Sequence, residues 1–389
     1  MLRNSRRLFL LSASVRAHAQ AAMRCQRPVV AIDGFLDADL NADEMIRANL
    51  EEDQFSLEIL EIVCQRSQPD DLLAYGSGFE SHPEFLDRLQ SCVRVLGNSP
   101  STVRLCADPV QLSNRLEKLG ISGPETRAQR PRDLEGWLVK QKGRTGGCHV
   151  QPASQCQGTS NSFYWQRQCT GKPHSALFLA AGGVAHVIGI SQLLPSERAD
   201  APYAWSGAIG PIRVLPEVFE QVQWASRVLA SDLDLLGLCG IDFIVDPKKE
   251  VQLVDLNPRL VATCELYADR FVSDYMSAHI ETCLTGDPDG HLVPASERGE
   301  GVRGVQVVYA PRPIAGMTNW KWPDGAADLP NSGTNIDAGQ PLCTVRGHYR
   351  DMDEARASLQ DLSHQVLAYL QLDTLHPFSP GSPAHEVAH

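Results

Sequence analysis

The stretch "GIDFIVDPKKEVQLVDLNPRL", residues 240–260, is the most informative segment of the sequence. Apolar and polar residues alternate on both sides of the four-residue loop "PKKE", and this pattern predicts two antiparallel strands joined by a turn. Counting outward from the loop pairs Ile244 with Leu253. The same register places Asp242 directly opposite Asp255, so two carboxylates are expected to face each other.

Opposed carboxylates in a sheet repel each other, because their Cβ atoms lie roughly 4.5–5.5 Å apart. A divalent cation would turn that repulsion into a metal site. Asn257 lies two residues beyond Asp255, hence on the same face, and offers another oxygen ligand. Such ligands suit Mg²⁺ or Mn²⁺ shared with nucleotide phosphates better than zinc. Arg259, two residues further on, would hold an oxyanion; the alternative is that both aspartates are ordinary solvent-facing strand residues.

A second segment, "WLVKQKGRTGG" at residues 137–147, ends an apolar strand with Lys140 and continues into a loop containing Gly143, Gly146 and Gly147. The backbone N–H groups of such a loop can approach phosphates while the ammonium group adds positive charge. The loop is not a P-loop, because the order G-x-x-x-x-G-K-[ST] is absent. Taken alone, the segment is better explained as a solvated hairpin turn.

The composition limits the partners and the class of protein. The 389 residues carry a formal net charge of −12, which argues against nucleic acid or an anionic membrane surface as the main partner. No apolar run approaches the roughly 18–20 residues of a membrane-spanning helix. The 11 cysteines are scattered singly, without a C-x-x-C pair. This usage predicts free cysteines in a reducing compartment rather than a disulfide framework or a zinc site.

The N-terminal segment allows two interpretations. The stretch "SRRLFLL", residues 5–11, resembles a twin-arginine export motif, but its apolar run is short for a signal peptide before Arg16 interrupts it. Alternatively, residues 8–11 form a buried strand, residues 16–24 a helix and residues 28–33 a second strand. Strand, helix and strand in this order begin a parallel α/β domain.

Local patterns predict the remaining elements. Residues 34–46 are expected to form a polar turn that leads into a helix, and a buried strand precedes a glycine-containing loop at 75–80, where open α/β sheets place ligand loops. Further helices are expected near residues 81–98, 108–120, 216–235, 269–284 and 353–370, with strands at 137–141 and in a hairpin over 162–194.

In their order and spacing, three segments resemble the ATP-grasp superfamily: Lys140 with its glycine loop, "QRQCTGKPHSALF" at 166–178, and "GIDF…VDLNPR". The chain also resembles one branch, the predicted ATP-dependent carboligases related to biotin carboxylase, with members linked to tetrahydromethanopterin and methanofuran one-carbon pathways. This branch resemblance extends over most of the chain, from "LSASVRAHAQ" to "DLPNSGTNIDAGQPLCTV".

The resemblance implies a mixed α/β protein with the ATP-grasp fold. A Rossmann-like domain is expected to precede the ATP-grasp domain, and a small β-rich domain to follow it. The expected boundaries are 1–125, 126–300 with a lid at about 135–195, 301–375, and a disordered tail at 376–389. Because the N-terminal strand would belong to the first sheet, the resemblance also implies an intact N-terminus and a cytoplasmic protein.

The resemblance also assigns roles to residues. Lys140 would contact the ATP phosphates, while Gly146 and Gly147 close over them. The adenine would meet the hinge at Gln166, Arg167 and Cys169. One or two Mg²⁺ ions would be held by Asp242, Asp255 and Asn257. Arg259 would stabilise an acyl-phosphate or its transition state. Candidate residues for the acceptor pocket are Ser14, Arg16, Gly78 and Glu80.

The activity implied by the resemblance is an ATP- and Mg²⁺-dependent ligase that joins a carboxylate to an amine. The partners would be small-molecule substrates, with no nucleic acid, no membrane and a possible homodimer. Pro109 stands where many members have a phosphate-binding lysine, and aspartate replaces the frequent glutamate at Asp242 and Asp255. Alternatives are an ATP-dependent carboxylase acting through carboxyphosphate, a nucleotide-binding regulator without turnover, and an exported solute-binding protein.

Overall fold

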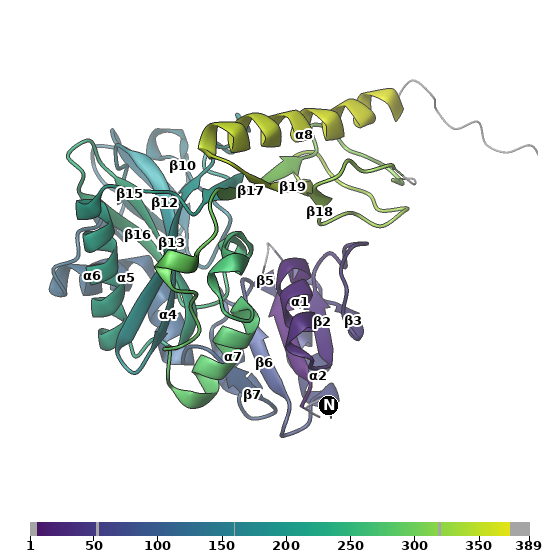
Figure 1. Cartoon of the computed structure of the whole chain (residues 1–389). Coiled ribbons are helices and arrows are strands. Elements are labelled where there is room, and N and C mark those ends of the chain that lie inside the picture. Colours follow the sequence, from purple (N-terminus) through teal and green to yellow (C-terminus); the bar gives the residue numbers. More distant parts are fainter. Residues whose placement is uncertain (1–5, 52–53, 159, 318–319, 374–389) are drawn as a thin grey trace, which may run out of the picture.

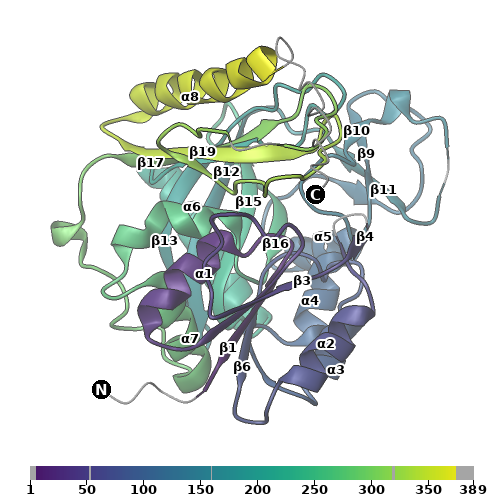
Figure 2. The ribbon, with the colours of Figure 1, turned by 90° about the vertical axis from the view of Figure 1, so that its right-hand side faces the viewer.

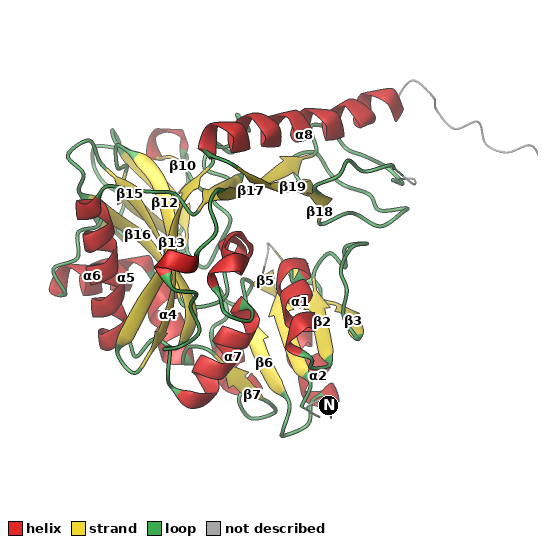
Figure 3. Cartoon of the chain, in the orientation of Figure 1, coloured by secondary structure: helices red, strands yellow, loops and turns green. Residues whose placement is uncertain are grey.

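The computed structural model of the chain describes residues 6–51, 54–158, 160–317 and 320–373. Its elements form a parallel α/β unit, a small antiparallel sheet and a large antiparallel sheet (Figures 1 and 3). The mixed α/β class expected from the sequence is therefore confirmed. The predicted disordered tail, residues 376–389, lies outside the described residues.

Strand β1 (Leu8–Ser12) is the central strand of the parallel sheet, and all of its residues are buried. The spatial order is β3 (Glu44–Arg47), β2 (Val29–Asp33), β1, β6 (Leu72–Tyr75) and β7 (Arg94–Leu96). Alternate residues of β1 pack toward α1 (Arg16–Ala22) on one face and toward α2 (Glu58–Arg66) and α3 (Glu84–Leu89) on the other (Figure 1). Helices on both faces explain the unbroken apolar run of this strand.

Two expectations for the parallel unit are wrong. The segment 34–46, expected as a polar turn leading into a helix, leads instead into edge strand β3 at Glu44–Arg47, whose half-buried and exposed residues alternate with the two-residue period of a strand. The helix expected from Ser81 to about Asn98 ends at Leu89, and Arg94–Leu96 form β7. Pairing of β7 with β6 is a long-range contact, and helical spacing of apolar residues does not reveal it.

One cysteine pair also departs from the prediction. Cys64, near the end of α2, and Cys92, before β7, form a disulfide. The sequence predicted only free cysteines, because no close pair is visible in it, whereas the fold brings together two cysteines 28 positions apart. The other cysteines of the described residues are free, and most of them are buried, as expected of small core residues.

Eight antiparallel strands form the large sheet. Their order is β16 (Val251–Asn257), β15 (Gly237–Val245), β12 (Lys172–Ala181), β13 (Val184–Leu193), β14 (Gly207–Gly210), β17 (Val302–Tyr309), β19 (Pro341–Tyr349) and β18 (Ala326–Ala327). Helices α5 (Pro109–Lys118) and α6 (Pro216–Asp232) share an apolar core with one half of this sheet. Helix α8 (Met352–Asp373) packs on β17 and β19 in the other half (Figure 3).

This arrangement bears on the expected domains. The strands after residue 301 continue the large sheet, and α5 packs on that sheet although it was expected in the N-terminal unit. The domain boundaries themselves remain a prediction.

The small sheet holds four short strands, which Figure 2 shows at the edge of the molecule. In spatial order they are β10 (Gln151–Pro152), β9 (Trp137–Gln141), β11 (Phe163–Arg167) and β8 (Thr126–Arg127). A separate core that includes Trp137, Val139 and Trp165 stabilises this sheet. The segment expected as one hairpin over 162–194 is therefore divided, because β11 joins the small sheet while β12 and β13 pair in the large one.

Shorter elements connect these sheets. They are β4 (Leu50–Glu51), β5 (Gln54–Phe55), α4 (Pro100–Ala107) and α7 (Tyr275–Thr285), with single turns of 3₁₀ helix η1 (Met23–Cys25), η2 (Ala153–Gln155) and η4 (Ala295–Glu297) and the longer η3 (Ala262–Arg270). No helix in the described part of the chain is both long enough and apolar enough to cross a bilayer.

The β15–β16 hairpin confirms the opposed aspartates, although its register differs from the predicted one. Asp242 faces Asp255, whereas Leu253 faces Phe243 and not Ile244. A register shift after Asp242 places one extra residue in β16. Such a bulge changes which residues face each other on its two sides. The two carboxylates are therefore opposed because of the bulge.

Arg16 connects the parallel unit to the C-terminal half of the chain. Its side chain is buried, and its guanidinium donates hydrogen bonds to Asp328 (2.8 and 3.0 Å) and to Glu265 (3.3 and 3.4 Å). Glu265 also accepts a hydrogen bond from Arg346 (3.2 Å). Burial lowers the pKa of Arg16, but Glu265 and Asp328 have the larger combined effect and raise this pKa above its ordinary value. Helix α1, η3 and the segment after β18 are thus held together by one cation.

We expect Arg16→Met to lower the free energy of unfolding by about 3 kcal/mol, because removing one partner of a buried ion pair leaves the other charge uncompensated. Urea unfolding monitored by circular dichroism measures this loss. Arg66→Gln, which breaks the exposed pair between Arg66 and Glu44, is the matched control and should change stability by no more than about 1 kcal/mol. Equal losses in the two variants would contradict the role of Arg16.

Candidate active site

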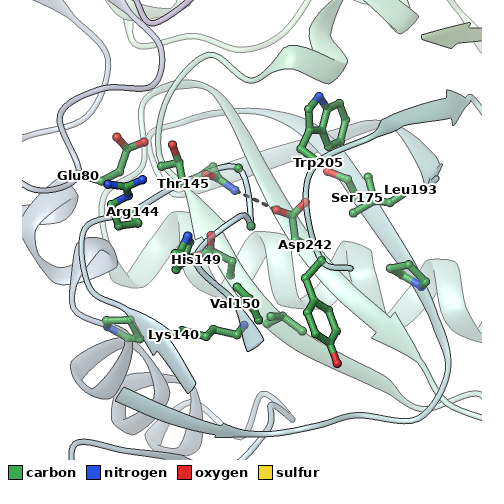
Figure 4. Close-up of a pocket in the computed structure, with 18 of the residues that line it drawn as sticks. Glu80, Lys140, Arg144, Thr145, His149, Val150, Ser175, Leu193, Trp205 and Asp242 are labelled. Carbon is green, nitrogen blue, oxygen red and sulfur yellow. Dashed lines mark hydrogen bonds between the residues drawn. The ribbon is translucent and has the colours of Figure 1, made fainter. Parts of the chain in front are cut away.

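A cavity of about 680 Å³ lies where the parallel unit, the small sheet and the large sheet meet. Its walls come from the loop after β6, the glycine loop after β9, the hinge after β11 and the β15–β16 hairpin. Figure 4 shows Lys140, Arg144 and His149 on one side of the cavity and Asp242 on the other. A space of this size accommodates a nucleotide-sized ligand.

The cavity brings together most of the residues that the sequence predicted for the site. Those that line it are Glu80, Lys140, Gly146, Gly147, Gln166, Arg167, Cys169, Asp242, Asp255, Asn257 and Arg259. They come from the loop after β6, from the four strands β9, β11, β15 and β16, and from the connections that follow β9, β11 and β16. The fold therefore gathers the candidate nucleotide, metal and oxyanion residues around one space.

Three predicted substrate residues do not line the cavity. Ser14 is exposed, and Arg16 is buried in its own ion-pair network. Gly78 shapes the loop that carries Glu80: its φ is +116°, and a Cβ at this position would lie 2.7 Å from the ring of Phe55. Its N–H donates to Glu80 (2.8 Å). Arg16 and Gly78 thus support the architecture around the cavity, and none of the three residues lines it.

The opposed aspartates carry the most unusual electrostatics of the cavity. Burial raises the pKa of Asp242, and burial together with the Asp242 charge raises the pKa of Asp255 to about 6. Lys140 and Arg259 act in the opposite direction on both carboxyl groups. Asp242 accepts hydrogen bonds from Asn257 (3.2 Å) and Ser175. The pair therefore has unfavourable electrostatics that an added cation would relieve.

Lys140 approaches this pair from the small sheet. It lies opposite Tyr164 on β11, so Gln166 is its diagonal neighbour on the same face. Its Nζ donates to Gln166 Oε1 (2.6 Å), and Gln166 Nε2 donates to Thr126 (3.2 Å). Burial lowers the pKa of Lys140, although Asp255 and other groups oppose this effect. The lysine is thus a half-buried cation whose direction is fixed by Gln166 on β11.

The glycine loop is closed over the cavity. The Gly143 carbonyl accepts a hydrogen bond from Ser81 Oγ (2.9 Å), and the Gly146 carbonyl accepts one from the Trp205 N–H (2.7 Å). Gly147 has a φ of +74°, and a Cβ there would lie 2.0 Å from the carbonyl oxygen of Tyr203. Positive φ and close backbone approach both require glycine. Contacts to both flanking parts of the chain therefore hold the loop.

Arg259 is positioned by a carboxylate from the other side of the cavity. Its Nε donates to Glu80 (2.6 Å), and its Nη2 donates to Asn257 Oδ1 (3.0 Å). Glu80 in turn accepts N–H bonds from Gly78 (2.8 Å) and Phe79 (3.0 Å). Glu80, predicted for the substrate pocket, lines the cavity and also orients Arg259; its role toward a substrate stays a prediction.

The donor set around the aspartates fits a Mg²⁺ ion shared with a nucleotide. Asp242, Asp255 and Asn257 offer oxygen ligands, which Mg²⁺ prefers. Among the described residues, no three His, Cys, Asp or Glu side chains gather into a metal-holding group. Mg²⁺ is commonly held by one or two carboxylates together with phosphates and waters, so two carboxylates suffice.

Several residues of the cavity were not predicted from the sequence. Arg144, Thr145 and His149 lie in the glycine loop, and burial, with Lys140 and Arg144 nearby, lowers the pKa of His149 to about 4. Because the glycine loop itself was predicted to contact phosphates, the position of these residues in it could have marked them as candidates for the cavity. Ser175 and Trp205 also line the cavity, and no local pattern marks them: pairing of β12 with β15 places Ser175 beside Asp242, and the Trp205 N–H donates to the Gly146 carbonyl (2.7 Å).

Comparison with known proteins identifies this architecture. Residues 106–263 match the family model described as an ATP-grasp domain. The chain has the ATP-grasp fold. The matched segment contains Lys140, the glycine loop, the hinge and the β15–β16 hairpin, that is, most of the cavity wall.

Solved structures support the same fold over nearly the whole chain. The biotin carboxylase domain of the 2-oxoglutarate carboxylase from Hydrogenobacter thermophilus, solved as a dimer with MgADP, ADP and bicarbonate, has a TM-score of 0.71 at 12% identity, covering 92% of this chain and 89% of that chain. Carboxyaminoimidazole ribonucleotide synthase from Aspergillus clavatus, complexed with ATP, has a TM-score of 0.69 at 14% identity, with coverage of 94% and 100%.

An amino acid ligase is similar as well. The L-amino acid ligase from Bacillus licheniformis has a TM-score of 0.68 at 12% identity, covering 94% of this chain and 98% of that chain. At such identities the similarity establishes the ATP-grasp fold and not the substrates. No curated protein matches the chain.

We expect Gly147→Ala to weaken Mg·ATP binding at least tenfold, because the new Cβ would collide with the Tyr203 carbonyl and displace the closed loop. Gly146→Ala is the matched control: its φ of +72° is similar, but nothing lies within 4 Å of its Cβ position. Titration calorimetry with Mg·ATP compares the two. Similar losses in both variants would show that backbone strain, and not the contact with Tyr203, sets the loop position.

The raised pKa of Asp255 predicts a pH-dependent gain in stability for Asp255→Asn. The unfolded carboxyl ionises near its ordinary pKa of 3.8 and the folded one near 6, so the stability present below pH 3.8 is lost as the pH rises through 6. In EDTA at pH 7.5 the variant should therefore be more stable than the wild type, by at most about 3 kcal/mol. Urea unfolding at pH 7.5 and at pH 4 tests this, since the gain should largely disappear at pH 4.

Proposed function

We propose that this protein is an ATP- and Mg²⁺-dependent ligase that joins a carboxylate to an amine through an acyl-phosphate and forms ADP. The observation that carries the proposal is the convergence of Lys140, the closed glycine loop, the opposed aspartates and Arg259 around one cavity. Phosphoryl transfer depends mainly on positioning and on neutralising developing charge, and these residues supply both.

Each part of the cavity has a role in the proposal. Lys140 neutralises phosphate charge, and the glycine loop excludes water from above it. Asp242, Asp255 and Asn257 hold Mg²⁺, which supplies further neutralisation of the phosphates when it is bound. Arg259, oriented by Glu80, binds the reacting carboxylate and the acyl-phosphate that it becomes. The hinge around Gln166, Arg167 and Cys169 binds the adenine.

The proposal includes the setting of the reaction. ATP is supplied in the cytoplasm, so we place the activity there. The sequence resemblance to the carboligase branch supports a role in one-carbon cofactor biosynthesis, in which glutamate would be added to a methanofuran or tetrahydromethanopterin precursor. This pathway rests on sequence resemblance alone, because a fold does not fix a substrate. A homodimer is proposed by analogy with the dimeric biotin carboxylase domain.

A carboxylase is the second candidate, and a specific observation favours it. The 2-oxoglutarate carboxylase domain with the same fold was solved with bicarbonate. In this case Arg259 would bind bicarbonate and its phosphorylated form, carboxyphosphate. A third candidate, a regulator that binds ATP without turnover, is favoured by Pro109, which lines the cavity at the place expected for a second lysine.

Nucleotide-dependent thermal stabilisation of the full-length protein tests the site. A ligand that binds only the native state raises the melting temperature by mass action. Mg·ATP should raise it, and the rise should be lost in EDTA and in Asp255→Ala. Asp246→Ala is the matched control, because Asp246 lies in the turn of the same hairpin, where its side chain accepts N–H bonds from Lys248 and Glu250. Absence of any shift in the wild type would overturn the proposed nucleotide site.

Turnover assays then separate the candidate functions. A ligase releases ADP only when an acid and an amine are both present, and glutamate belongs among the first substrates to be tried. A carboxylase needs bicarbonate for the release of ADP. Binding of Mg·ATP without ADP release under all of these conditions would favour the regulator.

A further inference from the structure

A second hollow, of about 430 Å³, lies on the small sheet. Four arginines line it: Arg127, Arg130, Arg132 and Arg167. We call it the arginine pocket. It is formed by the loop after β8, the start of β9 at Trp137 and the end of β11, and Figure 2 shows these two longer strands side by side. No residue of this pocket except Arg167 lines the main cavity.

The positive charge of the arginine pocket is only partly compensated. Glu125 pairs with Arg127 and lies 3.8 Å from Arg167. Arg130 donates to the backbone carbonyls of Cys156 (3.2 Å) and Gly158 (3.5 Å), which carry no net charge. Four cations and few carboxylates therefore gather here, in a chain whose net charge is −12. Such a concentration of like charge has a cost that a bound anion would remove.

Arg132 is the most available of these cations. In the described part of the chain, its exposed side chain makes no hydrogen bond and no ion pair. Asp133, beside it, also lines the pocket, but one of its oxygens accepts the N–H of Glu135 (3.0 Å). The N–H groups of the Arg132 guanidinium are therefore available to a ligand.

The pocket is also preorganised. The guanidinium groups of Arg127 and Arg167 lie 5.2 and 4.6 Å from the centre of the Trp137 ring. The indole itself is buried in the core of the small sheet, so it forms a fixed platform for both. Buried Pro131 restrains the loop between Arg130 and Arg132. Planar guanidinium groups held in this way match the oxygens of a phosphate group, often with two hydrogen bonds each.

We propose that the arginine pocket binds a phosphate-bearing small molecule, at a site separate from the main cavity. Its volume lies within the range of small-ligand pockets, which is roughly 300–1,000 Å³, and its concave form favours a small molecule over a flat protein surface. Several fixed guanidinium groups favour a phosphate or diphosphate group over a single carboxylate.

The position of the pocket gives its occupant a route to the main cavity. Arg167 lines both spaces, and its neighbour Gln166 accepts the hydrogen bond of Lys140. A ligand that draws Arg167 toward the arginine pocket acts on the same strand that fixes Lys140. Any coupling between the two sites must be reciprocal, so each ligand changes the affinity of the other by the same factor.

Calorimetric titration of inorganic pyrophosphate into the full-length protein, in EDTA, tests the proposal. Lys140→Met removes the cation that the proposed function assigns to the ATP phosphates, although Arg144 and Arg259 still line the main cavity, and this variant should still bind pyrophosphate in the arginine pocket. Adding Arg130→Gln and Arg132→Gln to it should weaken that binding at least tenfold. Adding Arg104→Gln instead is the matched control, because Arg104 is an exposed arginine paired with Asp87 on another surface. It should leave the binding within about twofold.

Two results would overturn the proposal: absence of pyrophosphate binding in Lys140→Met, or binding that survives the loss of Arg130 and Arg132. Arg132→Gln alone keeps the test valid if the double change disturbs the loop, because within the described residues the Arg132 side chain has no hydrogen bond or ion pair to lose. This change should by itself weaken binding several-fold. Titration of ATP into Lys140→Met distinguishes two sources of the phosphate. ATP binding that depends on Arg132 identifies the ligand of the arginine pocket as a second nucleotide. If pyrophosphate binds in an Arg132-dependent way but ATP does not bind, the ligand is a smaller phosphate compound.

Discussion

The opposition of Asp242 and Asp255 is the constraint around which the cavity is organised. Two half-buried carboxylates lie opposite each other on neighbouring strands; burial raises the pKa of both, and the charge of Asp242 raises that of Asp255 further. The compensating groups come from separate places: Lys140 from the small sheet and Arg259 from the end of the hairpin, where Glu80 of the parallel unit orients it. The three parts of the molecule therefore meet where negative charge has to be neutralised. An unfavourable pair of this kind is expected of a functional site.

The sequence predicted features that depend on near neighbours. The β15–β16 hairpin, the parallel start of the chain and the lysine with its glycine loop all follow from local periodicity or turn residues. The opposed aspartates were predicted with an incorrect register beside the turn, and the bulge after Asp242 compensates for that error. Such an irregularity leaves no mark in the alternation of apolar and polar residues. The pairing of Asp242 with Asp255 was therefore predicted correctly from a regular hairpin, although the real hairpin contains a bulge.

Features that depend on distant neighbours were not predictable in the same way. Ser175 is placed beside Asp242 by pairing of β12 with β15, and the disulfide partners Cys64 and Cys92 meet only in the folded parallel unit. The family resemblance placed Arg16 in the acceptor pocket, yet its partners are Glu265 and Asp328. In each case the partner lies on an element whose position the local pattern does not specify.

The ion pair of Arg16 has a consequence for folding during synthesis on the ribosome. Arg16 and Asp328 are separated by 312 positions. At about 5–20 residues per second, roughly 15–60 s pass between their synthesis. During that interval the first sheet can form, but Arg16, the first residue of α1, has Asp39 nearby and lacks Glu265 and Asp328, so this unit cannot reach its final stability. The early part of the chain must therefore stay protected from aggregation and proteolysis until almost all of the polypeptide has been made.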